Sequence, residues 1–207
     1  MIRILGRATS INVRKVLWLC DELALPFEHE PAWAAERPTS SPDFLALNPN
    51  GQVPVLIDGA QVLWESNTIC RYLAAREGRV DLLPAAPLAR ARVEQWMDWQ
   101  ATELNTAWRP AFMALVRRSP RFTDAQAVAD SAAAWNRLMT LLDAQLAQTG
   151  AFVAGADFTL ADIVLGLSAH RWRMTPIERP ALPAVSRWIE TLEGRAAFRR
   201  HGGADTP

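Results

Sequence analysis

Several residue types are scarce in this chain of 207 residues, and its charges cancel. Lys15 is the only lysine, Tyr72 is the only tyrosine, and arginine supplies nearly all of the positive charge. The 22 basic residues equal the 22 acidic residues, so the formal net charge at neutral pH is zero. A chain without net charge lacks the general electrostatic attraction that binds nucleic acids and anionic membranes. We therefore expect neither as a partner.

Cysteine is also scarce: Cys20 and Cys70 fall in helical patterns, and no Cys-x-x-Cys motif occurs. Two isolated cysteines do not make a disulfide framework, and buried free thiols are common. No apolar stretch approaches the roughly 20 residues of a membrane span, and the first residues lack the apolar core of a signal peptide. These absences predict a soluble protein of the reducing cytoplasm. His170 and His201 have no metal-ligand spacing to acids or cysteines, so we expect no metal.

Apolar patterns alternate in a regular way over the first part of the chain. Half of all residues are hydrophobic, which at this length permits a substantial core. Pro26 ends the first helical pattern, and Asp58-Gly59 is a hairpin turn signal. The patterns predict strands at 2–5, 27–30, 53–57 and 61–64, helices at 12–25 and from Ser66 onward, and a loop over 31–50 with one helical turn near 44–47.

Residues 79–87 interrupt the helical pattern, and we interpret them as a linker between two domains. The first domain is predicted over residues 1–78 and the second over 88–207. Only helical periodicity follows the linker, and the tail from Gly202 to Pro207 is expected to be disordered. The helices of the second domain are predicted at 88–117, 124–148, 159–173 and 182–192.

The most informative segment, residues 48–56, has the sequence Asn-Pro-Asn-Gly-Gln-Val-Pro-Val-Leu, and Glu65-Ser66 follows it at the start of a helical pattern. Proline has no backbone N–H, so Pro54 is awkward inside an ordinary paired strand. It fits a turn that leaves the amide and carbonyl of Val53 unpaired and facing a ligand. A cis X–Pro bond is the usual device for such a turn.

This segment resembles the glutathione-binding half of the cytosolic glutathione transferases, in which a Val/Ile-Pro step precedes a strand and a Glu/Gln-Ser pair at a helix start. The resemblance implies an α/β N-terminal thioredoxin-like domain (β-α-β-loop-β-β-α) plus an all-α C-terminal helical-bundle domain. Thr159 and Asp162 form a capping-box pattern, which resembles the cap of the core helix in that second domain. Its role is expected to be in folding.

The resemblance to bacterial, serine-type members implies a catalytic hydroxyl between the first strand and the first helix. There Ser10 precedes Arg14 by four residues, and its hydroxyl is expected to donate a hydrogen bond to the sulfur of glutathione. Such a donor and the positive end of the helix favour the thiolate. Thr9 and Asn12 are alternatives for the same contact. A second interpretation is that Ser10 or Asn12 only caps the helix.

The resemblance also implies contacts to the rest of glutathione. The backbone of Val53, before Pro54, is expected to pair with the cysteinyl part, strand-fashion. Ser66 is expected to bind the γ-glutamyl carboxylate, Glu65 its ammonium group, and Asn67 to assist. An ordinary helix cap is the alternative for the Glu65-Ser66 pair. Gln52 and Arg37 are candidates for the glycine carboxylate.

The implied function is transfer of the glutathione thiolate to a small hydrophobic electrophile bound between the domains, in a homodimer with a role in detoxification. Alternatives are a glutathione-dependent isomerase, dehalogenase or peroxidase of the same fold, or a non-enzymatic binding protein. The Ser-Ser-Cys stretch of the isomerases is absent. Arg109 is a candidate for steering an anionic substrate. The other candidates for the electrophile site are Trp96, Trp99, Trp108, Phe112 and Met113, although aromatic residues at helical spacing are more often core.

Overall fold

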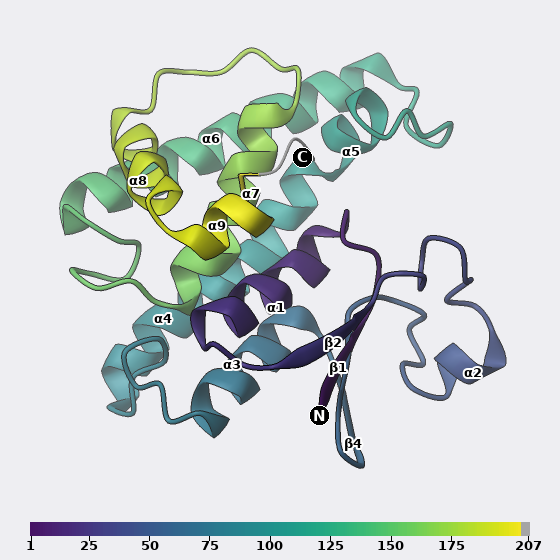
Figure 1. The fold of residues 1–207 in the computed structure, drawn as a ribbon. Helices are drawn as coiled ribbons and strands as arrows, with labels where there is room; N and C mark the ends of the chain where they lie inside the picture. The colour runs from purple at the N-terminus through teal and green to yellow at the C-terminus, as the bar shows by residue number, and fades with distance from the viewer. Residues whose placement is uncertain (204–207) are drawn as a thin grey trace.

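The computed structural model describes residues 1–203. Its N-terminal part is a four-stranded sheet in the order β2-β1-β3-β4 (Figure 1). β1 pairs in parallel with β2 and antiparallel with β3, and β3 pairs antiparallel with β4. The predicted β-α-β-loop-β-β-α order is confirmed. The elements are β1 (Ile2–Leu5), α1 (Ile11–Glu22), β2 (Phe27–Glu30), α2 (Pro42–Leu45), β3 (Val55–Asp58), β4 (Gln61–Trp64) and α3 (Ser66–Arg76).

The C-terminal part is helical within the described residues, as predicted. In Figure 1 its helices lie on the side of α1 and α3 that faces away from the sheet. They are α4 (Pro87–Trp99), α5 (Asn105–Leu115), α6 (Ala125–Thr149), α7 (Leu160–Met174), α8 (Pro183–Glu193) and α9 (Ala196–His201), with a π-helical segment, η1 (Gln100–Leu104), between α4 and α5.

Helix α1 is buried on two sides because it contacts β1 and α3 on one side and α7 and α9 on the other. Its residues from Val13 to Cys20 are all buried, and they include two cations, Arg14 and Lys15. Apolar residues of both halves therefore form one continuous core across α1. A smaller core on the other face of the sheet contains Leu5, Trp33, Phe44 and Val55.

The capping box at the start of α7 is confirmed. Asp162 is fully buried and accepts hydrogen bonds from the Thr159 amide at 2.9 Å and the Thr159 hydroxyl at 3.1 Å. Its second oxygen accepts from the Val153 amide at 2.9 Å and from the Trp188 indole at 3.0 Å. Burial raises the pKa of Asp162 to about 6, against these hydrogen bonds that favour the carboxylate. One side chain thus joins α7, α8 and the loop before α7.

Several predicted boundaries are wrong. The predicted long helix over 88–117 runs without a break from Pro87 to Leu115, but it contains the π-helical segment η1, which shifts the helical register and has no clear sequence signal. The first helix ends at Glu22, since Ala24 adopts a left-handed φ of 51°. The third strand starts at Val55 instead of Val53. Helix α9 was not predicted, and the predicted disordered tail falls, for residues 204–207, outside the described part.

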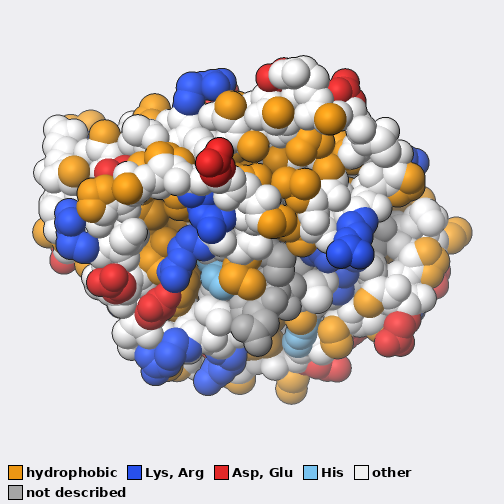
Figure 2. Space-filling view, turned by 90° about the horizontal axis from the view of Figure 1, so that it is seen from above, with side chains coloured by type: hydrophobic (Ala, Val, Ile, Leu, Met, Phe, Trp, Pro, Cys, Tyr) orange, Lys and Arg blue, Asp and Glu red, His pale blue; other side chains and the backbone are white. Residues whose placement is uncertain are grey.

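Charged side chains are interspersed with hydrophobic ones on the face shown in Figure 2. Because Lys15 is buried, the basic side chains seen there are arginines, and acidic side chains lie among them.

Candidate functional site

Two cavities meet at the start of α1. The first has a volume of about 700 Å³ and lies between this helix start and α5, while the second, of about 490 Å³, lies between the helix start and the loop around Arg37. Two cavities that share a wall suit two reactants that must meet. The residues that line both are Arg7, Ser10, Asn12 and Gln52.

Ser10 occupies the N-cap position of α1, but its side chain makes no capping hydrogen bond within residues 1–203. Its backbone amide donates to the Arg7 carbonyl at 3.1 Å, and its carbonyl accepts from the Arg14 amide at 3.0 Å. The hydroxyl therefore has no partner in the part of the chain that the structure describes, and it lies in the shared wall of the two cavities. The alternative that Ser10 only caps the helix with its side chain does not describe this geometry.

The two alternatives to Ser10 differ in position. Asn12 lines both cavities, and its Oδ1 atom is buried without a hydrogen-bond partner among the described residues. The Thr9 side chain is exposed and lines neither cavity, and its carbonyl accepts a hydrogen bond from Arg117 at 3.2 Å. Ser10 and Asn12 are brought together, whereas Thr9 is not.

The Val53–Pro54 peptide bond is cis. Val53 lines the second cavity, and within the described residues neither its amide nor its carbonyl has a backbone hydrogen-bond partner. Pro54 is buried behind it. Gly6 lies directly against Val53, because a Cβ atom built on Gly6 would be 2.7 Å from the Val53 Cβ atom. A free strand edge next to Ser10 is a surface on which an extended peptide can pair.

Glu65 and Ser66 lie beside the cis bond, because Val55 pairs with Trp64 in the sheet register. Glu65 has a left-handed φ of 69° and an exposed side chain, and Ser66 is buried at the first position of α3. Neither residue lines the two cavities described above. The Glu65 side chain does not cap the helix. The first amides of α3 therefore have no carbonyl partner within their helix and can bind an anion.

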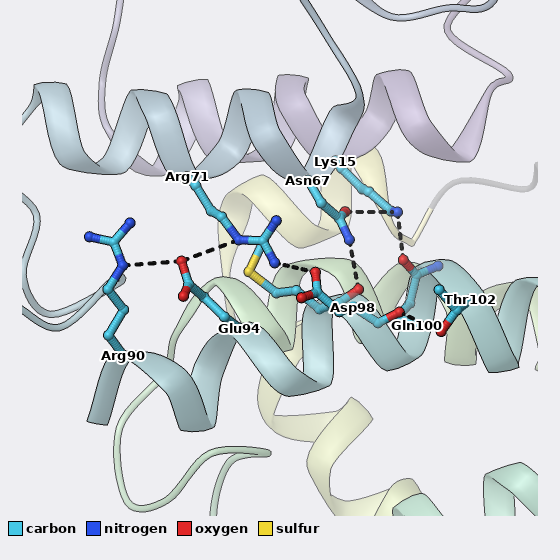
Figure 3. A network of polar contacts seen from close by, with 9 residues as sticks. Lys15, Asn67, Arg71, Arg90, Glu94, Asp98, Gln100 and Thr102 are labelled. Atoms are coloured by element: carbon cyan, nitrogen blue, oxygen red, sulfur yellow. Dashed lines mark hydrogen bonds and ion pairs between the residues drawn. The ribbon is translucent and has the colours of Figure 1, made fainter. Parts of the chain in front are cut away.

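The Asn67 side chain is committed elsewhere (Figure 3). It donates to the Met97 carbonyl of α4 at 2.7 Å and accepts from Lys15 Nζ at 3.1 Å. It is buried between the two halves of the chain, so its side chain is not available for the predicted ligand contact. The sequence could not predict these hydrogen bonds, because Lys15 and Met97 are distant from Asn67 in the chain.

Gln52 and Arg37 are the residues considered for the glycine carboxylate, and both are exposed in the lining of the second cavity. The Arg37 guanidinium lies 3.7 Å from the centroid of the Trp33 ring. This stacking holds the Arg37 guanidinium in place beside the second cavity. Gln52 also lines the first cavity, and its carbonyl accepts from the Asn48 side chain at 2.8 Å.

The first cavity contains four of the predicted electrophile-site residues, namely Trp108, Arg109, Phe112 and Met113. Trp96 and Trp99 do not line it, and their rings contact each other with centroids 5.2 Å apart. Sequence reasoning missed Arg171 of α7, which also lines the cavity. Its sequence signal is weak, because Arg171 is one of two arginines in the last turn of α7, where a basic residue is ordinary.

Two further structural results concern the described residues. None of the helices within residues 1–203 has both the length and the apolar character needed to cross a bilayer. The same part of the chain contains no group of three or more His, Cys, Asp or Glu side chains that could hold a metal ion.

Comparisons with known proteins agree with this geometry. Residues 9–76 match the family model for the glutathione S-transferase N-terminal domain, and residues 125–191 match that for the C-terminal domain. The chain is 39% identical over 202 residues to glutathione S-transferase GstB of Escherichia coli, covering 97% of each chain. It is 36% identical to glutathione S-transferase 3 of Zea mays, covering 96% of this chain and 92% of the relative.

A solved structure is also similar over the whole chain. It is the theta class glutathione S-transferase of Xanthomonas axonopodis pv. citri with glutathione bound, with a TM-score of 0.92 and 38% identity. The match covers 100% of this chain and 99% of the other. The predicted fold, enzyme class and co-substrate, glutathione, are therefore confirmed. By sequence and by fold, this chain belongs to the glutathione S-transferase family.

Proposed function

We propose that this protein joins the thiolate of glutathione to small apolar electrophiles, with the Ser10 hydroxyl as the hydrogen-bond donor to the sulfur. The observation that carries this proposal is the uncommitted hydroxyl of Ser10 in the wall shared by two cavities. One cavity is taken to hold glutathione, and the other the electrophile.

The chemistry requires a thiolate, because a free thiol has a pKa of about 8.5 and is mostly protonated at neutral pH. A hydroxyl donor at the sulfur stabilises the anion and lowers this pKa. The free amides at the start of α1 add the positive end of the helix dipole. Asn12, next to Ser10 in the same wall, is proposed as a second polar contact to the cysteinyl part of glutathione.

Glutathione is proposed to lie extended along the second cavity. The free amide and carbonyl of Val53 would pair with its cysteinyl residue. The Ser66 hydroxyl and the first amides of α3 would bind the γ-glutamyl carboxylate, and Glu65 would accept from the ammonium group. Gln52 and Arg37 would bind the glycine carboxylate. Asn67 acts indirectly in this proposal, since its hydrogen bonds position the start of α3.

A homodimer is proposed as the functional unit, with the N-terminal half of one subunit against the helical half of the other. Support comes from apolar side chains that the single chain leaves exposed, including Val62 and Trp64 on the edge strand β4 and Leu88 of α4. An interface would remove this surface from water. A cytoplasmic location and a role in detoxification are part of the same proposal.

The test is a pair of measurements on the purified protein. We expect retention on immobilised glutathione and conjugation of chlorodinitrobenzene at a rate well above the uncatalysed reaction. No retention and no thermal shift with millimolar glutathione would instead identify a protein that kept the fold without the activity. Binding without conjugation would move the function to another glutathione-dependent reaction.

A further inference from the structure

The first cavity has a strongly positive lining. None of the described acidic side chains lines it, although four arginines do. Apolar groups form much of the remaining wall, with Trp108, Phe112 and Met113 from α5. A purely hydrophobic electrophile would contact the apolar wall and leave the arginines without an anionic partner. The four cations are Arg7, Arg109, Arg117 and Arg171.

Arg171 is the unusual member of this set because it is only 3% exposed. Its Nε atom is buried without a hydrogen-bond partner, and its guanidinium forms no ion pair with a carboxylate of residues 1–203. Most arginines of this chain that are even partly buried have an acidic partner; Arg195, for example, pairs with Glu22. A buried cation without one is costly unless something else neutralises it.

Two aromatic rings offset part of the cost of burying the Arg171 charge. The Cζ atom of Arg171 lies 4.1 Å from the centroid of the Phe112 ring and 4.6 Å from that of Trp108. Contacts of this kind stabilise the flat face of a guanidinium. They leave its N–H donors, which lie in the plane of the group, available for an anion.

Neighbouring cations further disfavour the charged form of Arg171. Burial, together with the charges of Arg14 and Arg117, lowers the pKa of Arg171 well below its ordinary value. The Arg117 side chain is exposed at the cavity, and its Cζ atom lies 5.4 Å from the Phe112 ring centroid. Two cations that meet at one aromatic ring repel each other, and an anion between them would relieve the repulsion.

We propose that the guanidinium groups of Arg171 and Arg117 bind the carboxylate of an aromatic electrophile, so that aryl carboxylates are the preferred co-substrates of this enzyme. The proposal rests on the proposed function, because it assigns the first cavity to the electrophile. The aromatic body would lie against Trp108, Phe112 and Met113. Ser10, in the wall of the same cavity, would hold the glutathione sulfur near the reacting carbon.

For a chloro-nitro-benzoate the reaction is a nucleophilic aromatic substitution. The glutathione thiolate attacks the carbon that carries chlorine, a C–S bond forms, and the C–Cl bond breaks. Chloride leaves with the bonding electron pair, and the proton of the original thiol goes to solvent. No oxidant or further reactant is needed, and the carboxylate is unchanged and serves only to bind.

The experiment compares para-chloro-meta-nitrobenzoate with the corresponding benzamide, each relative to its uncatalysed rate. The two substrates have the same shape and differ in charge. We expect the wild-type protein to favour the acid in kcat/KM by about tenfold, the effect of one charge-assisted hydrogen bond. Arg171→Gln should remove this preference, mainly through KM of the acid, and Arg171→Lys should restore part of it.

Matched variants keep the test interpretable. Arg117→Gln should lower the preference for the acid less than Arg171→Gln does, since its side chain is exposed. Arg118→Gln is the control, because Arg118 is the exposed neighbour in sequence and does not line the cavity. If Arg171→Gln does not fold, Arg117→Gln and competitive inhibition by nitrobenzoate against nitrobenzamide in the wild type decide the question.

Two outcomes would overturn the carboxylate site while leaving the proposed function intact. One is efficient conjugation of chlorodinitrobenzene without any preference for the acid or inhibition by nitrobenzoate. The other is an equal loss of activity toward acid and amide in Arg171→Gln. If chlorodinitrobenzene itself is not conjugated, the proposed function fails, and calorimetric binding of nitrobenzoate to wild type and Arg117→Gln still tests the anion site.

Discussion

Lys15 Nζ donates a hydrogen bond of 2.7 Å to Oε1 of Gln100 and so joins α1 of the sheet half to the π segment of the helical half (Figure 3). Both residues are buried. Gln100 extends the connection by donating to the Ser168 hydroxyl of α7 at 3.0 Å. The only lysine of the chain is therefore a buried polar link between its two halves.

The first prediction concerns the pH dependence of this link. Burial lowers the pKa of Lys15 from 10.5 to about 7. Between these pH values the unfolded chain holds a proton that the folded chain has released, so the contribution of Lys15 to the free energy of unfolding rises with pH. Its slope is at most about 1.4 kcal/mol per pH unit. Urea unfolding at pH 7 and pH 9 measures it.

Lys15→Met provides the reference for that measurement because it has no ionisable group at this position. We expect the difference in unfolding free energy between wild type and Lys15→Met to change in favour of the wild type from pH 7 to pH 9. The thiols of Cys20 and Cys70, whose pKa values burial raises to about 12, are present in both proteins. Parallel pH profiles would show that the lysine keeps its ordinary pKa.

The second prediction concerns the core helix α7. Asp162→Asn replaces a carboxylate that accepts four hydrogen bonds by an amide whose NH₂ group faces donors. We expect a loss of roughly 2–4 kcal/mol of unfolding free energy, because buried donors lose their partner. Thr159→Ala should cost about 1 kcal/mol. Asp157→Asn, at an exposed position in the same loop, is the control and should be nearly neutral in chemical denaturation.

The third prediction separates the roles of two serines. Ser10→Ala should lower turnover with chlorodinitrobenzene about tenfold or more and raise the apparent pKa of bound glutathione, since the thiolate loses a donor. Ser66→Ala should weaken glutathione binding with little effect on that pKa. The ultraviolet absorbance of the thiolate as a function of pH measures the pKa of bound glutathione in both variants. Identical behaviour of the two variants would contradict this division of roles.

Thr9→Ala tests the same assignment from the other side. The Thr9 side chain lines neither cavity, so its removal should leave turnover and the thiol pKa close to wild type. A loss of thiolate in Thr9→Ala but not in Ser10→Ala would move the sulfur contact to Thr9.

The fourth prediction concerns the support behind Val53. A Cβ atom at Gly6 would lie 2.7 Å from both the Val13 Cγ2 atom and the Val53 Cβ atom. Gly6→Ala should therefore destabilise the protein by about 1–3 kcal/mol and weaken glutathione binding by displacing Val53. Gly59→Ala separates crowding from backbone strain, because Gly59 has a positive φ but open space around it. It should lose some stability and keep its affinity for glutathione.

The short-range features of the site could be predicted from sequence. Val53-Pro54 and Glu65-Ser66 are separated by one hairpin, and Asp58-Gly59 specifies its turn, so their proximity follows from local geometry. The Thr159–Asp162 capping box spans a single helical turn for the same reason. The Asp58-Gly59 signal marked the boundary between β3 and β4, whereas the left-handed residue Ala24 and the π segment had no such signal.

Tertiary packing decided which side chains line the cavities of the site. The sequence favoured Ser10 and left Thr9 and Asn12 as alternatives, and the packing of α1 between the sheet and α7 places Ser10 and Asn12 in the lining of the cavities. The same packing commits Asn67 to Lys15 and Met97. It also brings Arg171 against Trp108, although the two belong to different helices.

By itself, the sequence determined the family, the sheet with its cis-proline turn, and the cap of the core helix, because each depends on residues that are neighbours in the chain. Only the tertiary structure decided that the single lysine joins the two halves and that a buried arginine, Arg171, lines the first cavity. These facts depend on how helices distant in sequence share one core, and charge desolvation at such contacts has no local sequence signal.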